Sequence, residues 1–151
     1  MLQSNAPSKG PHLLTVIDWE LVRIGNSATD IGQFAAEAFM LDRFRGGKGL
    51  HAAFIRAYFK ASAVKLGSKE TLYFWMTRIA IHFAVHLAVW PSRSVHWANG
   101  EDTMALVRHA VFVMMDAVSS NPNIMLWGVF DGLADIASEM MDRRDSGRQT
   151  S

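Results

Sequence analysis

Acidic residues near the start of the chain occupy positions that could do chemistry. The apolar, β-branched run from His12 to Asp18 is typical of a strand; it delivers Asp18 at its end, with Trp19 and Glu20 directly after it. A carboxylate held at the rim of a sheet suits a hard cation such as Mg2+, which binds one or two carboxylates together with substrate phosphates. An Asp that only caps the turn after a strand would look the same, so the residues alone leave both interpretations open.

Two histidines form a second pair of residues that could do chemistry. His82 and His86 are four residues apart, a spacing that can place two imidazoles on one metal ion from a single helix face. No Glu stands beside the first of them and no third ligand is indicated. The pair therefore favours histidines that pack inside a helical bundle, with a metalloenzyme as the alternative. Further along, three acids at helical spacing favour a solvated helix face: Asp131, Asp135 and Glu139.

The elements that must position these residues are mostly helices. Met1 to Gln3 and His12 to Asp18 predict a β-hairpin, which needs other elements to cover it because a lone hairpin is marginal in water. Arg45 to Gly49 lacks the spacing and the hydroxyl of a phosphate loop and predicts a flexible connector. The first predicted helix begins at Asp30 as its N-cap, with Gln33 completing a capping box, and ends at that connector. Four more predicted helices follow: Leu50 to Leu66, Lys69 to Trp90 (stopping at Pro91), Asp102 to Val118, and Ile124 to Met141.

Two of these helices carry a prediction about burial. The third is apolar on most sides and long enough to raise the question of a membrane span. Arg78 lies inside it, however, and a central Arg costs about 2.5–3.5 kcal/mol on insertion. We therefore expect the central, fully buried helix of a soluble bundle and no membrane partner. In the second helix, the apolar residues that recur at three and four predict the buried face: Ala53, Phe54, Ala57, Tyr58, Ala61 and Val64.

Composition limits the classes of protein to which the chain can belong. Its 151 residues are 50% hydrophobic and 19% charged, which is typical of a globular domain rather than a disordered chain. A net charge of +1 does not favour a nucleic-acid partner, and the absence of cysteine excludes a disulfide scaffold and a thiolate site. The predicted fold is mainly α, a short β-hairpin followed by a four- to five-helix bundle over residues 1–142, with a polar tail at 143–151.

The segment from Thr15 to Phe44 resembles the metal-binding segment of the aminoglycoside phosphotransferase and choline kinase-like family. These are small-molecule kinases with a protein-kinase-like fold. Their pattern is an apolar residue, Ile, Asp, an aromatic residue and Glu, then a stretch that includes a Gly, then Asp, an apolar residue and Gly or Ala. The helices downstream resemble the family's C-terminal helical subdomain in pattern alone. The residues that match the segment are Asp18, Trp19, Glu20, Gly25, Asp30 and Gly32.

The resemblance implies a role for each matched position. Asp18 would be the Mg2+ ligand, at the place of the Asp in the protein-kinase Asp-Phe-Gly signature, and Glu20 a nearby acidic support. Trp19, Asp30 and Gly32 would be structural, with Asp30 bracing the active-site loops from the start of the next helix. The resemblance also implies Mg2+ and ATP as cofactors of the full family fold, a small hydroxyl-bearing substrate and a cytoplasmic location.

The same resemblance implies parts that these residues do not include. Family members carry a His-Gly-Asp-x-x-x-x-Asn catalytic loop before the hairpin, and an N-lobe with a nucleotide loop and a strand Lys. Phosphoryl transfer relies on all of these parts. We therefore expect the C-terminal part of such a kinase, with no catalytic residue of its own, inactive alone and unable to bind Mg2+ and ATP productively. The alternative is a non-catalytic helical module or pseudoenzyme that self-associates, or pairs with another protein, through uncovered apolar surface.

Overall fold

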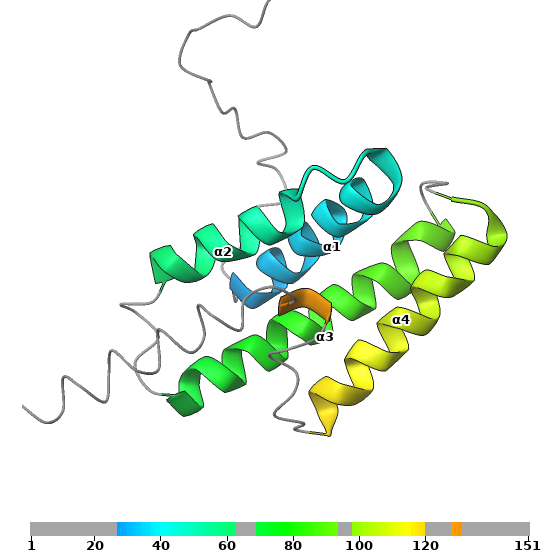
Figure 1. Ribbon diagram of the computed structural model, residues 1–151. Helices are drawn as coiled ribbons and strands as arrows, with labels where there is room; N and C mark the ends of the chain where they lie inside the picture. Colours follow the sequence, from blue (N-terminus) through cyan, green and yellow to red (C-terminus); the bar gives the residue numbers. More distant parts are fainter. Residues whose placement is uncertain (1–26, 63–68, 94–97, 120–127, 131–151) are drawn as a thin grey trace, which may run out of the picture.

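The computed structural model describes residues 27–62, 69–93, 98–119 and 128–130, and within these ranges every element is a helix. This confirms the mainly helical prediction for the described residues, whereas the predicted hairpin and the polar tail lie outside them. The elements are α1 (Ser27–Arg45), α2 (Leu50–Ser62), α3 (Lys69–Arg93), α4 (Gly100–Val118) and the short 3-10 helix η3 (Gly128–Phe130) (Figure 1).

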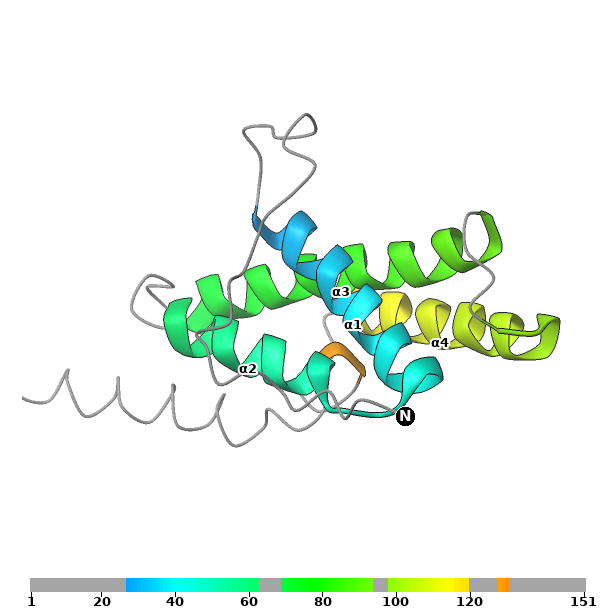
Figure 2. The same ribbon diagram turned by 90° about the horizontal axis from the view of Figure 1, so that it is seen from above.

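α3 is the central helix of the described bundle. α1 crosses one side of α3, and α4 runs antiparallel along another side (Figures 1 and 2). α2 packs on α1, so it lies at the far side of the bundle from α4 (Figure 2). α2 also contacts α3, because the rings of Tyr58 and Phe59 pack against the ring of Trp75.

Small side chains let α1 and α3 approach closely. Ala28 and Ala35 on α1 are fully buried, as are Ala80 and Ala84 on α3. Around this contact, larger apolar side chains from every described helix fill the core, and burial of their surface stabilises it by about 25 cal/mol per Å2. The larger core residues include Met40, Ile55, Phe59, Met76, Phe83, Leu106, Val113 and Phe130.

Three helix ends differ from the sequence prediction. α1 begins at Ser27, so Asp30 lies in its first turn instead of capping it; Ala28 is buried against the core, which extends the helix back past Asp30. α3 continues through Pro91 to Arg93. Proline removes one hydrogen bond to the preceding turn, and here that loss falls in the last turn, where few further bonds depend on it. α4 begins at Gly100 because Asn99 is its N-cap: the Asn99 Oδ1 atom accepts a hydrogen bond from the backbone N–H of Asp102 at 2.8 Å.

The predicted buried face of α2 is correct only in part, because Phe54 and Tyr58 are half-buried and Phe54 packs against the core. The residues that it buries are His51, Ile55 and Phe59, four apart, whereas Ala53 and Ala57 are exposed. The alanines of the predicted stripe offer little apolar area, so the helix turns the larger Ile55 and Phe59 side chains to the core. α2 is described as far as Ser62. Residues 63–66 of the prediction lie outside the described ranges.

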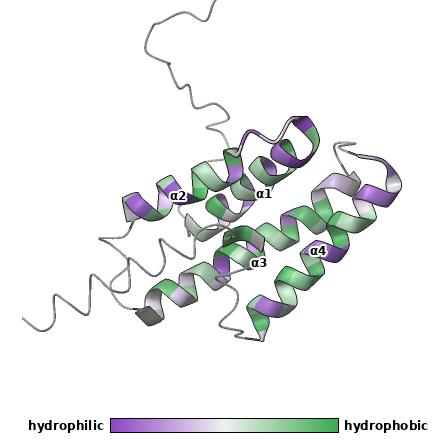
Figure 3. Ribbon diagram, viewed as in Figure 1, coloured by the Kyte–Doolittle hydropathy of each residue, from purple (hydrophilic) through white to green (hydrophobic). Residues whose placement is uncertain are grey.

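The prediction that the third helix is fully buried is wrong. α3 is central, but Phe74 is 62% exposed and Val85 44% exposed, because α1 and α4 cover only part of its circumference. By length and composition the stretch Thr71–Pro91 could cross a membrane, a test that core helices of soluble proteins also pass. Figure 3 shows apolar residues, in green, along both α3 and α4. Of the predicted fifth helix, residues 128–130 are described, and they form η3.

Candidate functional site

The residues predicted to form the site divide into two groups. Asp18, Trp19 and Glu20 lie outside the described residues. Asp30 and Gly32 lie in the first two turns of α1, where Asp30 is exposed and Gly32 is buried. A carboxylate in the first turn of a helix interacts favourably with the positive end of the helix dipole. What the structure describes is therefore the helix that directly follows the predicted metal-binding segment, and the contacts that hold this helix in place.

Gly32 marks the closest approach of α1 to α3. A Cβ atom built at this position would lie 2.7 Å from the backbone oxygen of Ile79, 2.7 Å from the Cβ of His82 and 2.9 Å from the backbone nitrogen of Phe83. Real Cβ atoms essentially never come that close to other heavy atoms, and two of the three are backbone atoms that cannot rotate away. Position 32 therefore requires glycine for lack of space, which fixes where α1 crosses α3 (Figure 2).

The two histidines of α3 each contact a polar residue of α1. His82 Nε2 forms a hydrogen bond with the hydroxyl of Thr29 at 3.2 Å. His86 Nε2 lies 2.6 Å from the Glu37 carboxylate, which accepts the hydrogen bond, and the His86 ring stacks on Trp90. The prediction that these histidines pack the helices is confirmed, because both tie α3 to α1. Within the described ranges, no three His, Cys, Asp or Glu residues come together as a metal site.

Asp42 has a structural role that the sequence patterns did not predict. It lies in the last turns of α1, and its Oδ2 atom accepts a hydrogen bond from the backbone N–H of His51 at 2.8 Å, in the first turn of α2. That bond holds the pKa of Asp42 below its usual value, with support from the backbone N–H groups of Lys48, Gly49 and Leu50. Asp42 thus caps the next helix across the connector. An acid that precedes a run of glycines and a helix start is the signal that could have found it.

The connector itself has the conformation that its glycines allow. The backbone N–H of Gly47 donates to the carbonyl of Asp42 at 2.8 Å, a bond that spans five residues and closes the C-terminus of α1. Gly47 has φ +54° and Gly49 has φ +73°, values that other residues seldom adopt. The prediction of a connector between two helices is confirmed.

An aromatic cluster joins α1, α2, α3 and α4 next to this junction. The Phe39 ring contacts the rings of His51, Phe83 and His109 at centroid distances of 5.5–5.8 Å. His109 stacks on Phe39 at 5.5 Å, and its buried Nε2 has no hydrogen-bond partner among the residues described. Burial lowers the pKa of His109, and the nearby positive charge of Arg43 lowers it further. The cluster therefore favours a neutral imidazole.

Comparison with known proteins connects this scaffold to kinases. Over 125 residues the chain is 24% identical to 4-hydroxytryptamine kinase from Psilocybe cubensis, and over 126 residues it is 25% identical to the protein of the same name from Psilocybe cyanescens. The chain is similar to kinases. The two alignments cover 81% and 82% of this chain but only 32% of each relative, so the chain spans about a third of the length of the kinases that it matches. No family model and no solved structure matches it.

The similarity and the geometry agree on what these helices can do. Similarity to part of a kinase is consistent with a kinase-like fragment. The described helices supply packing and caps: Gly32 sets the crossing of α1 on α3, and Asp42 sets the start of α2. These contacts hold the described helices against one another.

Proposed function

We propose that this chain is the C-terminal helical part of an aminoglycoside phosphotransferase-like kinase, which transfers the γ-phosphate of ATP to a hydroxyl group on a small molecule. The observation that carries the proposal is the similarity to two kinases over four fifths of the chain. The spacing from Asp18 to Gly32 supports the narrower family, because it matches the family pattern at six positions.

In this proposal Asp18 is the Mg2+ ligand and Glu20 its acidic support, and Asp30 and Gly32 belong to the structure that positions them. Bound Mg2+ neutralises charge that develops on the phosphates during transfer. Asp18 lies nine positions before Ser27, the first residue of α1. A support of fixed geometry matters there because phosphoryl transfer depends mainly on positioning and charge stabilisation. The close contact at Gly32 supports such a role, because it fixes the position at which α1 packs on α3.

The proposal extends to the setting of the reaction. We place the chain in the cytoplasm, without a nucleic-acid or membrane partner. The net charge of +1 supports the exclusion of a nucleic-acid partner. The exclusion of a membrane partner is supported by the polar groups of α3. His82 and His86 form hydrogen bonds with α1, as expected in a bundle of helices packed in water.

The test is a phosphotransferase assay with Mg2+ and ATP on a panel of small hydroxyl compounds: aminoglycosides, choline, other amino alcohols and 4-hydroxytryptamine. These residues contain no His-Gly-Asp sequence, so the 151-residue chain is expected to show no turnover. A longer in-frame chain read from the transcript, which supplies that sequence, is expected to phosphorylate a member of the panel and to lose activity in the Asp18→Asn variant. Glu101→Gln is the matched control, because it removes an exposed carboxylate from α4. Activity of the longer chain that survives Asp18→Asn would contradict the assignment of Asp18.

A further inference from the structure

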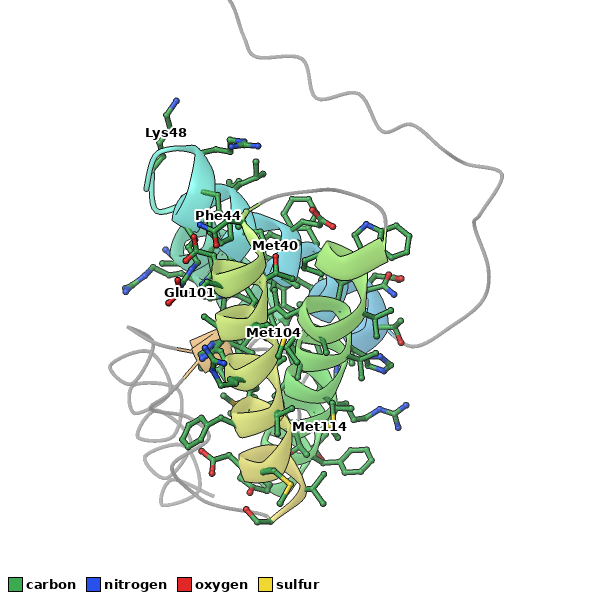
Figure 4. The ribbon with its side chains drawn as sticks, turned by 90° about the vertical axis from the view of Figure 1, so that its right-hand side faces the viewer. Met40, Phe44, Lys48, Glu101, Met104 and Met114 are labelled. Carbon is green, nitrogen blue, oxygen red and sulfur yellow. The ribbon has the colours of Figure 1, made fainter. Side chains whose placement is uncertain are left out.

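The outer face of α4 is the most apolar exposed surface among the described residues. Of the large apolar side chains that are exposed, five lie on this helix, and no described helix covers them. Figure 4 looks onto this side of the molecule, with Glu101 and Met104 at the N-terminal end of α4 and Met114 near the other end. The exposed fractions are 53% for Met104, 52% for Val111, 53% for Phe112, 65% for Met115 and 69% for Val118.

Apolar area of this kind on one helix marks an interaction surface, since exposed apolar side chains are normally scattered singly. Val111 and Met115 are four residues apart, and Phe112 lies beside them, so the three form a continuous patch around the middle of α4. The opposite side of the helix buries Leu106, Ala110, Val113 and Ala117 in the core. α4 is therefore apolar on two sides, and only one of them is covered by α3.

The charges around this patch are arranged symmetrically. Arg108 lies four residues before Phe112 and Asp116 lies four residues after it, so the three form one ridge along the helix. At a rise of about 1.5 Å per residue, the two charges stand about 6 Å to either side of the aromatic ring. Arg108 is exposed and Asp116 is half-buried. Asp116 also takes part in an interaction within the chain, and a carboxylate has two oxygens that can accept from more than one donor.

We propose that two copies of this chain associate through the outer face of α4, antiparallel to each other about a twofold axis at Phe112. In this arrangement the Phe112 rings meet at the axis, Arg108 of each copy faces Asp116 of the other, and Val111 and Met115 are covered. A parallel arrangement would place like charges opposite each other, which is unfavourable. A twofold interface uses the same patch on both copies, so it needs a patch that is complementary to itself, as this ridge is. The inference does not depend on the proposed kinase function.

The exposed apolar residues of α3 make a less suitable partner surface. The Arg78 guanidinium lies over the Phe74 ring at 5.5 Å, so the most exposed aromatic side chain of α3 already has a cation within its own helix. A contact through one helix of each copy is small, so we expect a weak dimer, with dissociation in the range of about 1 to 100 µM.

Sedimentation equilibrium of the purified chain across that concentration range tests the proposal. The wild-type chain is expected to shift from monomer to dimer. Arg108→Asp and Asp116→Arg are each expected to weaken the dimer at least about tenfold, because each places like charges opposite one another at both ends of the contact. An equimolar mixture of these two variants is expected to dimerise again, since every facing pair in the mixed dimer is then one acid and one Arg. In a parallel dimer the facing charges would be alike in the wild type and in both variants, so weakening by the single substitutions is what distinguishes the antiparallel arrangement. Single variants that dimerise as well as the wild type, or a mixture that fails to dimerise again, would overturn it.

Two aromatic substitutions locate the surface. Phe112→Ser is expected to weaken the dimer at least about tenfold, whereas Phe74→Ser, which removes a ring of similar exposure from α3, is expected to leave it unchanged. The opposite result would overturn the assignment to α4. A chain that stays monomeric and co-floats with phosphatidylcholine and phosphatidylglycerol vesicles would assign the face to a membrane instead. A chain that stays monomeric without binding vesicles would show that another segment covers it. Circular dichroism of each variant checks that the helices are intact.

Discussion

α1 meets α3 through a glycine and alanines that bring two backbones together, whereas its contact with α2 combines aromatic rings with one carboxylate that accepts backbone N–H groups. The first contact depends on shape, which neither pH nor salt changes. The second depends in part on charge, so it weakens when the carboxylate is protonated. The position of α1 on α3 is therefore set by the lack of space at Gly32, whereas the start of α2 is set by the Asp42 cap.

The strongest way to break the first contact is Gly32→Ala. The added Cβ would lie 2.7 Å from the backbone oxygen of Ile79, so α1 and α3 must separate. We expect the free energy of unfolding to fall by about 2–3 kcal/mol, measured by urea denaturation. The matched control is Gly100→Ala, where nothing lies within 4 Å of the new Cβ. The control is expected to be neutral or to gain up to about 1 kcal/mol from helix propensity. Equal effects at the two positions would contradict the close contact.

Asp42→Asn tests the second contact and is expected to have a smaller effect. The amide keeps an oxygen that can accept from the His51 N–H but loses the negative charge, so α2 should start less firmly. Because the pKa of Asp42 is lower in the folded chain than its ordinary value of 3.8, the stabilisation is present above that pH and is lost as pH falls through the folded value. The variant should therefore be less stable than wild type near neutral pH and match it in strong acid. A constant difference across pH would show that the charge is not responsible.

His109 provides a pH test where α4 meets the same junction. Its folded pKa lies below the ordinary value of 6.5, so the unfolded chain takes up a proton before the folded chain does. The stability contributed by neutral His109 is therefore present above that value and lost as pH falls through the folded pKa. His109→Phe keeps a ring against Phe39 and should lose less stability than wild type between about pH 7 and pH 5. Thermal melts at several pH values measure this, and parallel pH profiles would contradict it.

Glu37→Gln tests how much a polar interaction contributes to the α1–α3 contact. The Glu37 carboxylate is partly exposed, so its pairing with His86 is screened by water, and we expect a loss of less than about 1 kcal/mol. A loss as large as that of Gly32→Ala would mean that polar ties, rather than shape, hold α1 on α3.

Sequence patterns predicted the helices better than their ends. The starts of α2 at Leu50 and α3 at Lys69, and the end of α4 at Val118, agree with prediction because local signals mark them. The start of α1 was missed because burial of Ala28 is a tertiary effect that extends the helix past Asp30. The buried face of α2 was predicted only in part for the same kind of reason, since periodicity alone does not say which side of the helix the core covers most fully.

The candidate site was predictable only in part. The packing role of His82 and His86 followed from the lack of a third ligand, but their partners Thr29 and Glu37 lie about fifty positions away and no local pattern points to them. Asp42 was missed because its role appears only when the connector brings α2 back against the end of α1. The metal-binding role of Asp18 remains a prediction, supported by the family pattern and outside the described residues.

Gly32 in α1 and Gly47 in the connector are expected to respond differently to substitution by a D-amino acid. Gly47, at φ +54°, has the backbone shape that a D-residue prefers, and a Cβ added in the L configuration meets only the Asp42 carbonyl, at 3.7 Å. A semisynthetic chain with D-alanine at 47 should keep the connector and restrict the unfolded ensemble, a stabilising change. At 32 the backbone is α-helical, so D-alanine brings a helix penalty and cannot serve as a remedy. Handedness thus separates a glycine kept for its torsion angle from a glycine kept for its size.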